Sequence, residues 1–139
     1  MIILDTNVIV AFMRDSPDPE VVLWLDGQLR ASIWTTAINV YEIRSGLLEM
    51  PAGQRRISRS LAFERLLSDT IQGRIAAFDL VAAQQAAELE AAGKRSGRPR
   101  DPRDTMIAGI VLAARATLAT RNVKHFEDIA KSVVNPWTA

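Results

Sequence analysis

The stretch MIILDTN, residues 1–7, joins a run of four apolar residues directly to three polar ones. A short apolar run bounded by polar residues is typical of a buried strand, so we expect a strand over residues 1–4. Asp5, Thr6 and Asn7 then lie at the carboxyl end of that strand. In α/β sheets, ligands bind beyond the carboxyl ends of the strands. A carboxylate in this place is therefore a candidate site residue.

Helices and strands are expected to alternate along the rest of the chain. Apolar periodicity and turn residues predict helices over residues 8–13, 20–29, 37–50, 53–68, 80–92, 102–114 and 124–130. Further strands are predicted over residues 31–36, 74–78, 117–120 and 132–135, and a loop over 93–99. Because parallel strands need crossover connections, which are usually helices, this alternation predicts a mostly parallel sheet covered on both faces.

Composition excludes several kinds of site. The 139 residues are 48% hydrophobic, enough for one buried core, and the net charge of +1 points neither to nucleic acid nor to a membrane surface. Cysteine is absent and His125, expected on a helix surface, is the only histidine, which rules out disulfides and histidine-rich zinc sites. Because we find no signal peptide and no run of about 18 apolar residues, we expect a cytoplasmic protein without a membrane span.

Three acidic residues also have ordinary structural explanations. Asp5 could simply cap the first helix. Asp101 followed by Pro102 is typical of a helix start, which places Asp104 in the first turn, where a carboxylate gains about 0.3–1 kcal/mol from the helix dipole. Glu42 lies within a predicted helix, where glutamate is common on a solvated face. Small residues one turn later nevertheless leave room for a ligand beside it.

Four motifs, in this order, resemble those of the PIN domain family. They are MIILDTNV at residues 1–8, VYEIRSG at 40–46, DPRDTMIA at 101–108, and LATRN at 118–122 followed by Phe126. Within that family the chain is similar to toxins of VapBC-type toxin–antitoxin pairs, and NPW at residues 135–137 is similar to the FitB branch. The resemblance covers residues 1–139 and implies a single α/β/α domain with a central parallel sheet of four to five strands.

The resemblance also implies which residues carry the activity. The family's acidic positions fall on Asp5, Glu42 and Asp104, which are thereby identified as catalytic and metal-binding residues. A further catalytic position, aspartate in some members, falls on Asn122, which carries no charge. Neighbouring polar residues expected to support the site are Thr6, Asn7 and Thr120.

The implied activity is that of a ribonuclease dependent on Mg²⁺ or Mn²⁺. Mg²⁺ prefers oxygen ligands from carboxylates, water and phosphates, and three clustered acids would repel one another without a cation. A bound cation can polarise the phosphate and activate water, so no nucleophilic side chain is required. The resemblance implies hydrolysis of RNA to 5′-phosphate and 3′-hydroxyl ends.

Positive charge that could bind RNA gathers just before Asp104. The candidate RNA-binding residues are Lys94, Arg95, Arg98, Arg100 and Arg103, with Arg44 and Arg121 as lesser candidates. Contacts to backbone phosphates would weaken as salt rises. The alternative is an ordinary solvated loop and helix start.

Other classes of function compete with a nuclease. A phosphatase of the haloacid dehalogenase type would need a second aspartate where this chain has Asn7. A phospho-receiver domain would need an acidic pair after the first strand and a lysine after a late one, and neither is present. A non-catalytic module that binds nucleic acid or an antitoxin stays open as the alternative.

The resemblance implies partners as well. Toxins of this family usually form homodimers and are held inactive by a cognate VapB-type antitoxin, whose segment enters the acidic groove. The other end of the antitoxin typically binds operator DNA. This chain would therefore meet DNA only through its partner, within a larger toxin–antitoxin assembly.

Overall fold

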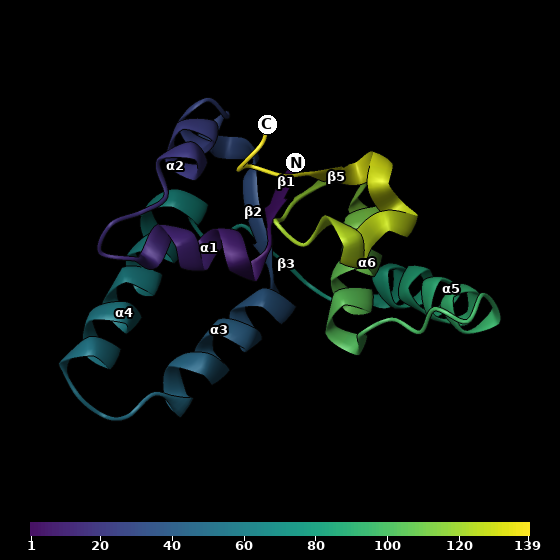
Figure 1. The fold of residues 1–139 in the computed structure, drawn as a ribbon, viewed down its shortest axis with the longest axis horizontal. Coiled ribbons are helices and arrows are strands. Elements are labelled where there is room, and N and C mark those ends of the chain that lie inside the picture. The colour runs from purple at the N-terminus through teal and green to yellow at the C-terminus, as the bar shows by residue number, and fades with distance from the viewer.

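Five short strands form one sheet in the order β3-β2-β1-β4-β5 (Figure 1). They are β1 (Ile2–Leu4), β2 (Ile33–Thr36), β3 (Ile75–Ala76), β4 (Thr117–Ala119) and β5 (Val133–Val134). All neighbouring strands pair in parallel. The computed structural model describes all of residues 1–139. It confirms the predicted α/β class and a parallel sheet with five strands.

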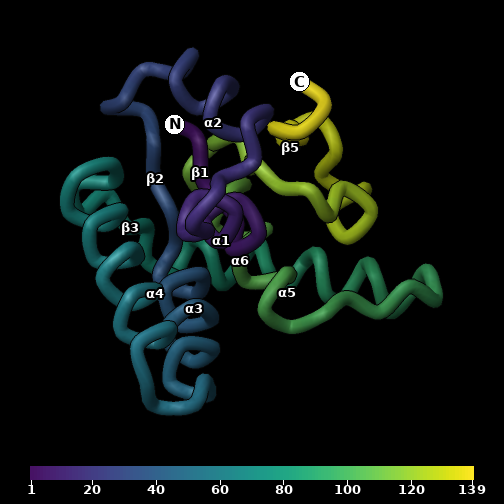
Figure 2. Tube along the Cα trace, turned by 60° about the vertical axis from the view of Figure 1, so that its left-hand side comes forward, coloured from purple at the N-terminus to yellow at the C-terminus, as the bar shows by residue number.

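Helices cover both faces of the sheet. They are α1 (Thr6–Met13), α2 (Pro19–Asp26), α3 (Ala37–Glu49), α4 (Gln54–Arg65), α5 (Leu80–Arg95) and α6 (Pro102–Ala114), with 3-10 or π-helical segments η1 (Arg30–Ser32), η2 (Leu66–Ile71) and η3 (Val123–Ser132). Figures 1 and 2 show α3 beside α4 on one side of the sheet and α5 beside α6 on the other. None of these helices has the length and apolar character needed to cross a membrane.

The two faces of the sheet have separate apolar cores. Successive residues of a strand point to opposite faces, and β1 follows this rule. Leu4 packs into a cluster with Val8 and Phe63, whereas Ile3 packs into a cluster with Phe126 and residues of α6. The four consecutive apolar residues at the start of the chain therefore reflect a strand that is covered on both sides.

Several segments differ from the sequence prediction. Residues 31–32, predicted as strand, belong to η1, the helix predicted over residues 20–29 ends at Asp26, and the helix predicted over 53–68 gives way to η2 after Arg65. The helix predicted to end at residue 92 continues to Arg95, so Gly93 lies inside α5 rather than in a loop. A Cβ at Gly93 would lie 2.7 Å from the carbonyl oxygen of Arg98, so glycine lets the following loop fold back onto the helix. The helix predicted over 124–130 is instead η3, interrupted at Phe126 and Ile129, whose side chains are buried in the core.

A close contact between α5 and α6 fixes the direction of α6. A Cβ at Gly109 would lie 2.5 Å from the carbonyl oxygen of Ala82 and 2.8 Å from the Cβ of Ala86. Only glycine allows the two helices to approach so closely. This contact matters for the site because the first turn of α6 carries Asp104.

Candidate functional site

Acidic side chains from three elements lie near the carboxyl end of β1. Asp5 directly follows β1 and caps α1, Glu42 lies in α3, and Asp104 lies in the first turn of α6. Figure 1 shows the starts of these three helices gathered at the same end of the sheet. The charge of Asp5 raises the pKa of both other carboxyls, which places the three groups within electrostatic range of one another.

Asp5 is held rigidly. Its side chain is buried, and each of its carboxylate oxygens accepts two hydrogen bonds. Oδ1 accepts from the backbone N of Thr6 and from Asn39 Nδ2, both at 2.9 Å. Oδ2 accepts from Thr120 Oγ1 at 2.7 Å and from Asn7 Nδ2 at 3.3 Å. Asp5 therefore combines the helix-capping role with a place in the acidic cluster.

Asn39 belongs to the site and was missed by the sequence analysis. It is fully buried, and its Nδ2 donates to Asp5 Oδ1 and, at 3.1 Å, to Thr6 Oγ1. Its Oδ1 accepts from the hydroxyl of Thr36, the N-cap of α3, at 2.6 Å. A usable signal was present, because Asn39 precedes Glu42 by three residues and so shares its helix face.

Glu42 and Asp104 carry their negative charge at an energetic cost. Burial is the largest cause of the raised pKa of Glu42, followed by the charge of Asp5. Burial also raises the pKa of Asp104 most, followed by the charges of Asp101 and Asp5. The Thr6 hydroxyl donates to Glu42 Oε1 at 3.2 Å and offsets part of the cost for Glu42.

Glu42→Gln is expected to raise the free energy of unfolding by about 0.5–1 kcal/mol near neutral pH. A raised pKa means that the folded protein binds a proton more readily than the unfolded chain, so the ionised carboxylate destabilises the fold above that pKa. The gain should vanish below about pH 4, under the pKa of an unfolded glutamate. Urea denaturation near neutral pH and again below about pH 4 measures this gain in the free energy of unfolding. Glu88→Gln, on the exposed face of α5, is the control. A gain that does not depend on pH would contradict this prediction.

The remaining polar residues lie at the same strand ends. The backbone N of Asp5 donates to the carbonyl of Ala119, which brings Thr120 beside Asp5. Asn7 Oδ1 accepts from the backbone N of Arg121 at 3.0 Å. Asn122 is exposed, and its backbone N donates to Thr120 Oγ1, whereas its side chain makes no hydrogen bond within the chain.

The basic residues occupy different environments. Lys94 and Arg95 are exposed in the last turn of α5, and Arg98 is exposed in an ion pair with Glu127. The side chain of Arg100 is buried and pairs with Asp128.

Arg103 alone approaches the acidic cluster, with Nη1 3.9 Å from Glu42 Oε2, which lowers the pKa of that carboxyl. Arg44 pairs with Glu64, and Arg121 stacks on Trp137.

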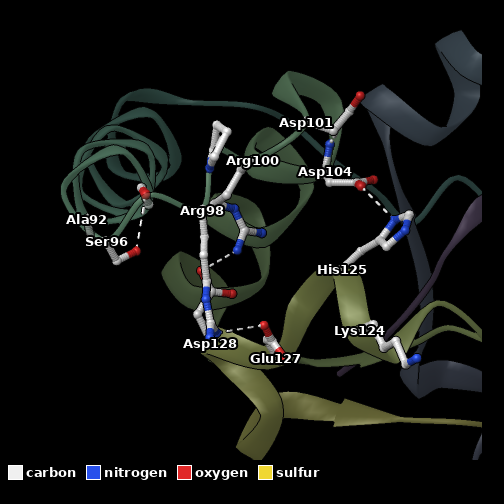
Figure 3. A pocket seen from close by; sticks show the side chains of 12 residues that line it. Ala92, Ser96, Arg98, Arg100, Asp101, Asp104, Lys124, His125, Glu127 and Asp128 are labelled. Carbon is white, nitrogen blue, oxygen red and sulfur yellow. Dashed lines mark hydrogen bonds and ion pairs between the residues drawn. The ribbon is translucent and has the colours of Figure 1, made fainter.

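An open cavity of about 530 Å³ adjoins Asp104 (Figure 3). Its walls come from the end of α5, the loop that follows it, the start of α6 and η3. In Figure 3, Asp104 and His125 point toward each other, and Nδ1 of His125 lies 3.1 Å from Asp104 Oδ2. The sequence predicts His125 on a helix surface, and its side chain is exposed, but the sequence gives no sign of its contact with Asp104.

The donor atoms of the cluster suit a hard divalent cation. No three acidic or histidine side chains lie close enough together to hold an ion alone. Mg²⁺, however, commonly takes one or two carboxylates and completes its shell with water and phosphate oxygens. A cation beside Glu42 and Asp104 would relieve the cost that raises the pKa of both groups. The chemistry of these side chains therefore fits such an ion.

A parallel α/β sheet with acidic residues at its carboxyl end is consistent with a PIN-type domain. Residues 2–132 match the PIN domain family, to which the chain belongs. Relatives include a VapC ribonuclease of Sinorhizobium fredii, 38% identical over 99% of this chain and 98% of that protein, and the toxin FitB of Neisseria gonorrhoeae, 32% identical over 99% of both. The plasmid stability protein StbB of Pseudomonas syringae pv. tomato is 37% identical over the full length of both.

Solved structures agree with this assignment. FitAcB from Neisseria gonorrhoeae matches with a TM-score of 0.86 and 32% identity, covering 100% of both chains. FitAB bound to a DNA fragment matches with a TM-score of 0.88 and 32% identity, covering 99% of this chain and 96% of that one. The resemblance to the VapC and FitB group is confirmed.

Proposed function

We propose that the chain is the toxin of a type II toxin–antitoxin pair and acts as a metal-dependent endoribonuclease. The observation that carries this proposal is the convergence of Asp5, Glu42 and Asp104, two of them with raised pKa values, at the carboxyl end of a parallel sheet. The names of the relatives, a VapC ribonuclease and the toxin FitB, support the same activity. We propose RNA as the substrate and Mg²⁺ or Mn²⁺ as the cofactor.

The three acidic residues share one role in this proposal. Asp5, Glu42 and Asp104 would hold the cation together with water and phosphate oxygens, and a bound cation would polarise a phosphate and lower the pKa of water. Asp5 supplies a carboxylate whose orientation is fixed by four hydrogen bonds. The hydroxyls of Thr6 and Thr120 keep Glu42 and Asp5 in place.

RNA binding would use the positive charge beside the acidic cluster. The proposed contacts are Lys94, Arg95, Arg98, Arg100 and Arg103, whereas Asn122 at the adjoining strand end is proposed as a further catalytic residue. Arg98 is exposed and can turn from Glu127 toward a phosphate, whereas Arg100 is buried and would act mainly by shaping the cavity. RNA affinity should therefore fall with rising salt, and Arg98→Gln should weaken it more than an equivalent change far from the cavity.

We propose a cognate VapB-type antitoxin as the partner of this toxin. The relative FitB is named a toxin, and a FitAB structure contains a DNA fragment. By analogy, operator DNA would be reached only through the antitoxin, and the toxin would form a homodimer within a larger toxin–antitoxin assembly. The single domain would act in the cytoplasm, where RNA and antitoxin are present.

Growth of a bacterial host that expresses the chain from an inducible promoter tests this function. We expect arrest with the wild-type protein and with Asp15→Asn, an exposed control in the turn after α1, but growth with Asp5→Asn. Equal amounts of soluble protein should be verified in each case. Undiminished arrest with Asp5→Asn would show that toxicity does not come from the acidic cluster and would favour the non-catalytic binding module.

A further inference from the structure

The three carboxylates differ in what holds them. Asp5 accepts four hydrogen bonds, and Glu42 accepts one from the Thr6 hydroxyl. The Asp104 carboxylate accepts none from its own helix. Its one hydrogen-bond partner is Nδ1 of His125, 3.1 Å from Oδ2, and Oδ1 has no partner within the chain. The orientation of Asp104 thus depends on a residue from another element.

The segment that carries His125 is held against α6 by the residues around it. The next residue, Phe126, is fully buried in the core. Asp128, one turn further along η3, pairs with Arg100, which also donates from Nε to Thr105 Oγ1 at 3.2 Å. Thr105 directly follows Asp104 in the chain. These contacts tie η3 to the start of α6 around the point where His125 meets Asp104, although the His125 side chain is 58% exposed.

We propose that His125 is a positioning residue for Asp104. An ionised carboxylate only accepts hydrogen bonds, so His125 donates from Nδ1 to Oδ2 and leaves Oδ1 available to a cation. Carboxylates that bind metals are commonly oriented by such a second hydrogen bond, and its loss typically weakens metal affinity about 10–100-fold. This inference rests on the proposed metal-dependent function and assigns a role in it to the only histidine of the chain.

The affinity of the purified full-length chain for Mn²⁺, measured by titration calorimetry, tests this role. His125→Leu removes the donor, whereas His125→Asn places an amide N–H near the position of Nδ1. Lys131→Leu, at an exposed position of the same segment, is the matched control. We expect His125→Leu to raise the Kd for Mn²⁺ about tenfold. His125→Asn should recover most of the affinity, and the control should bind as the wild type does.

The outcomes separate this inference from the function on which it rests. Equal Mn²⁺ affinity in wild type and His125→Leu would overturn the positioning role while leaving the proposed function intact. A His125→Asn variant as weak as His125→Leu would also overturn it, because the hydrogen bond would not be the cause. A folded wild-type protein that binds no Mn²⁺ would overturn both. Thermal unfolding without metal should be unchanged in all variants, because the side chain of His125 is largely exposed.

Discussion

Asp104→Asn is expected to reduce RNA cleavage by at least about a hundredfold, equivalent to about 2.7 kcal/mol of transition-state stabilisation. Asparagine has nearly the same shape as aspartate but removes one of the three negative charges that would hold the cation. Because burial and the neighbouring charges of Asp101 and Asp5 raise the pKa of Asp104, removing its charge should leave stability unchanged or improved. Loss of activity without loss of stability is the signature of a functional carboxylate.

The rate of cleavage at saturating Mn²⁺ and the melting temperature together measure this effect. Asp26→Asn, at the exposed end of α2, removes the same charge far from the site and serves as the control. Cleavage by Asp104→Asn within about threefold of the control, a difference of under 1 kcal/mol, would contradict the role assigned to this carboxylate.

Asn39→Ala is expected to lower the free energy of unfolding by about 2–4 kcal/mol and to reduce cleavage as well. The buried amide donates to Asp5 and Thr6 and accepts from the hydroxyl of Thr36. Alanine would leave the Thr36 hydroxyl without its acceptor and Asp5 without one of its four donors. A buried polar group that loses its partner costs about 1–3 kcal/mol, more when it is charged.

Urea denaturation compares Asn39→Ala with Gln84→Ala, which removes an amide from the exposed face of α5. Asn39→Asp is an informative third variant, because it would place a second carboxylate where Nδ2 now lies 2.9 Å from Asp5 Oδ1. That variant should be unstable at neutral pH and recover as the pH falls, since protonation removes the repulsion. Stability of Asn39→Ala within about 0.5 kcal/mol of the control would show that the buried amide is dispensable.

Much of the fold was predictable because its signals are local. An apolar strand followed at once by Asp5, and the regular alternation of strands and helices, were enough to predict a parallel sheet and to place a carboxylate at its edge. The motifs around Glu42 and Asp104 supplied the other two acids through the family resemblance. The structure brings all three within electrostatic range.

The features that the sequence did not reveal depend on contacts between distant segments. Asn39 is 34 residues from Asp5, and although its spacing from Glu42 places both residues on one helix face, no local feature of the sequence indicates that its amide contacts Asp5. The contact between His125 and Asp104 spans 21 residues and depends on the irregular path of η3. Gly93 was predicted to lie in a loop, because the sequence does not distinguish a glycine that close packing requires from one that a turn requires.

The most direct test of a metal-dependent nuclease is cleavage of cellular RNA by the purified protein, freed of antitoxin. The reaction is run with Mg²⁺ or Mn²⁺ and, in parallel, with EDTA, and the ends of the fragments are then mapped. We expect discrete fragments with 5′-phosphate ends, no cleavage in EDTA, and recovery when Mn²⁺ is added in excess. Cleavage that survives EDTA, or a folded protein that cuts no RNA at any metal concentration, would contradict a metal-dependent nuclease built on Asp5, Glu42 and Asp104.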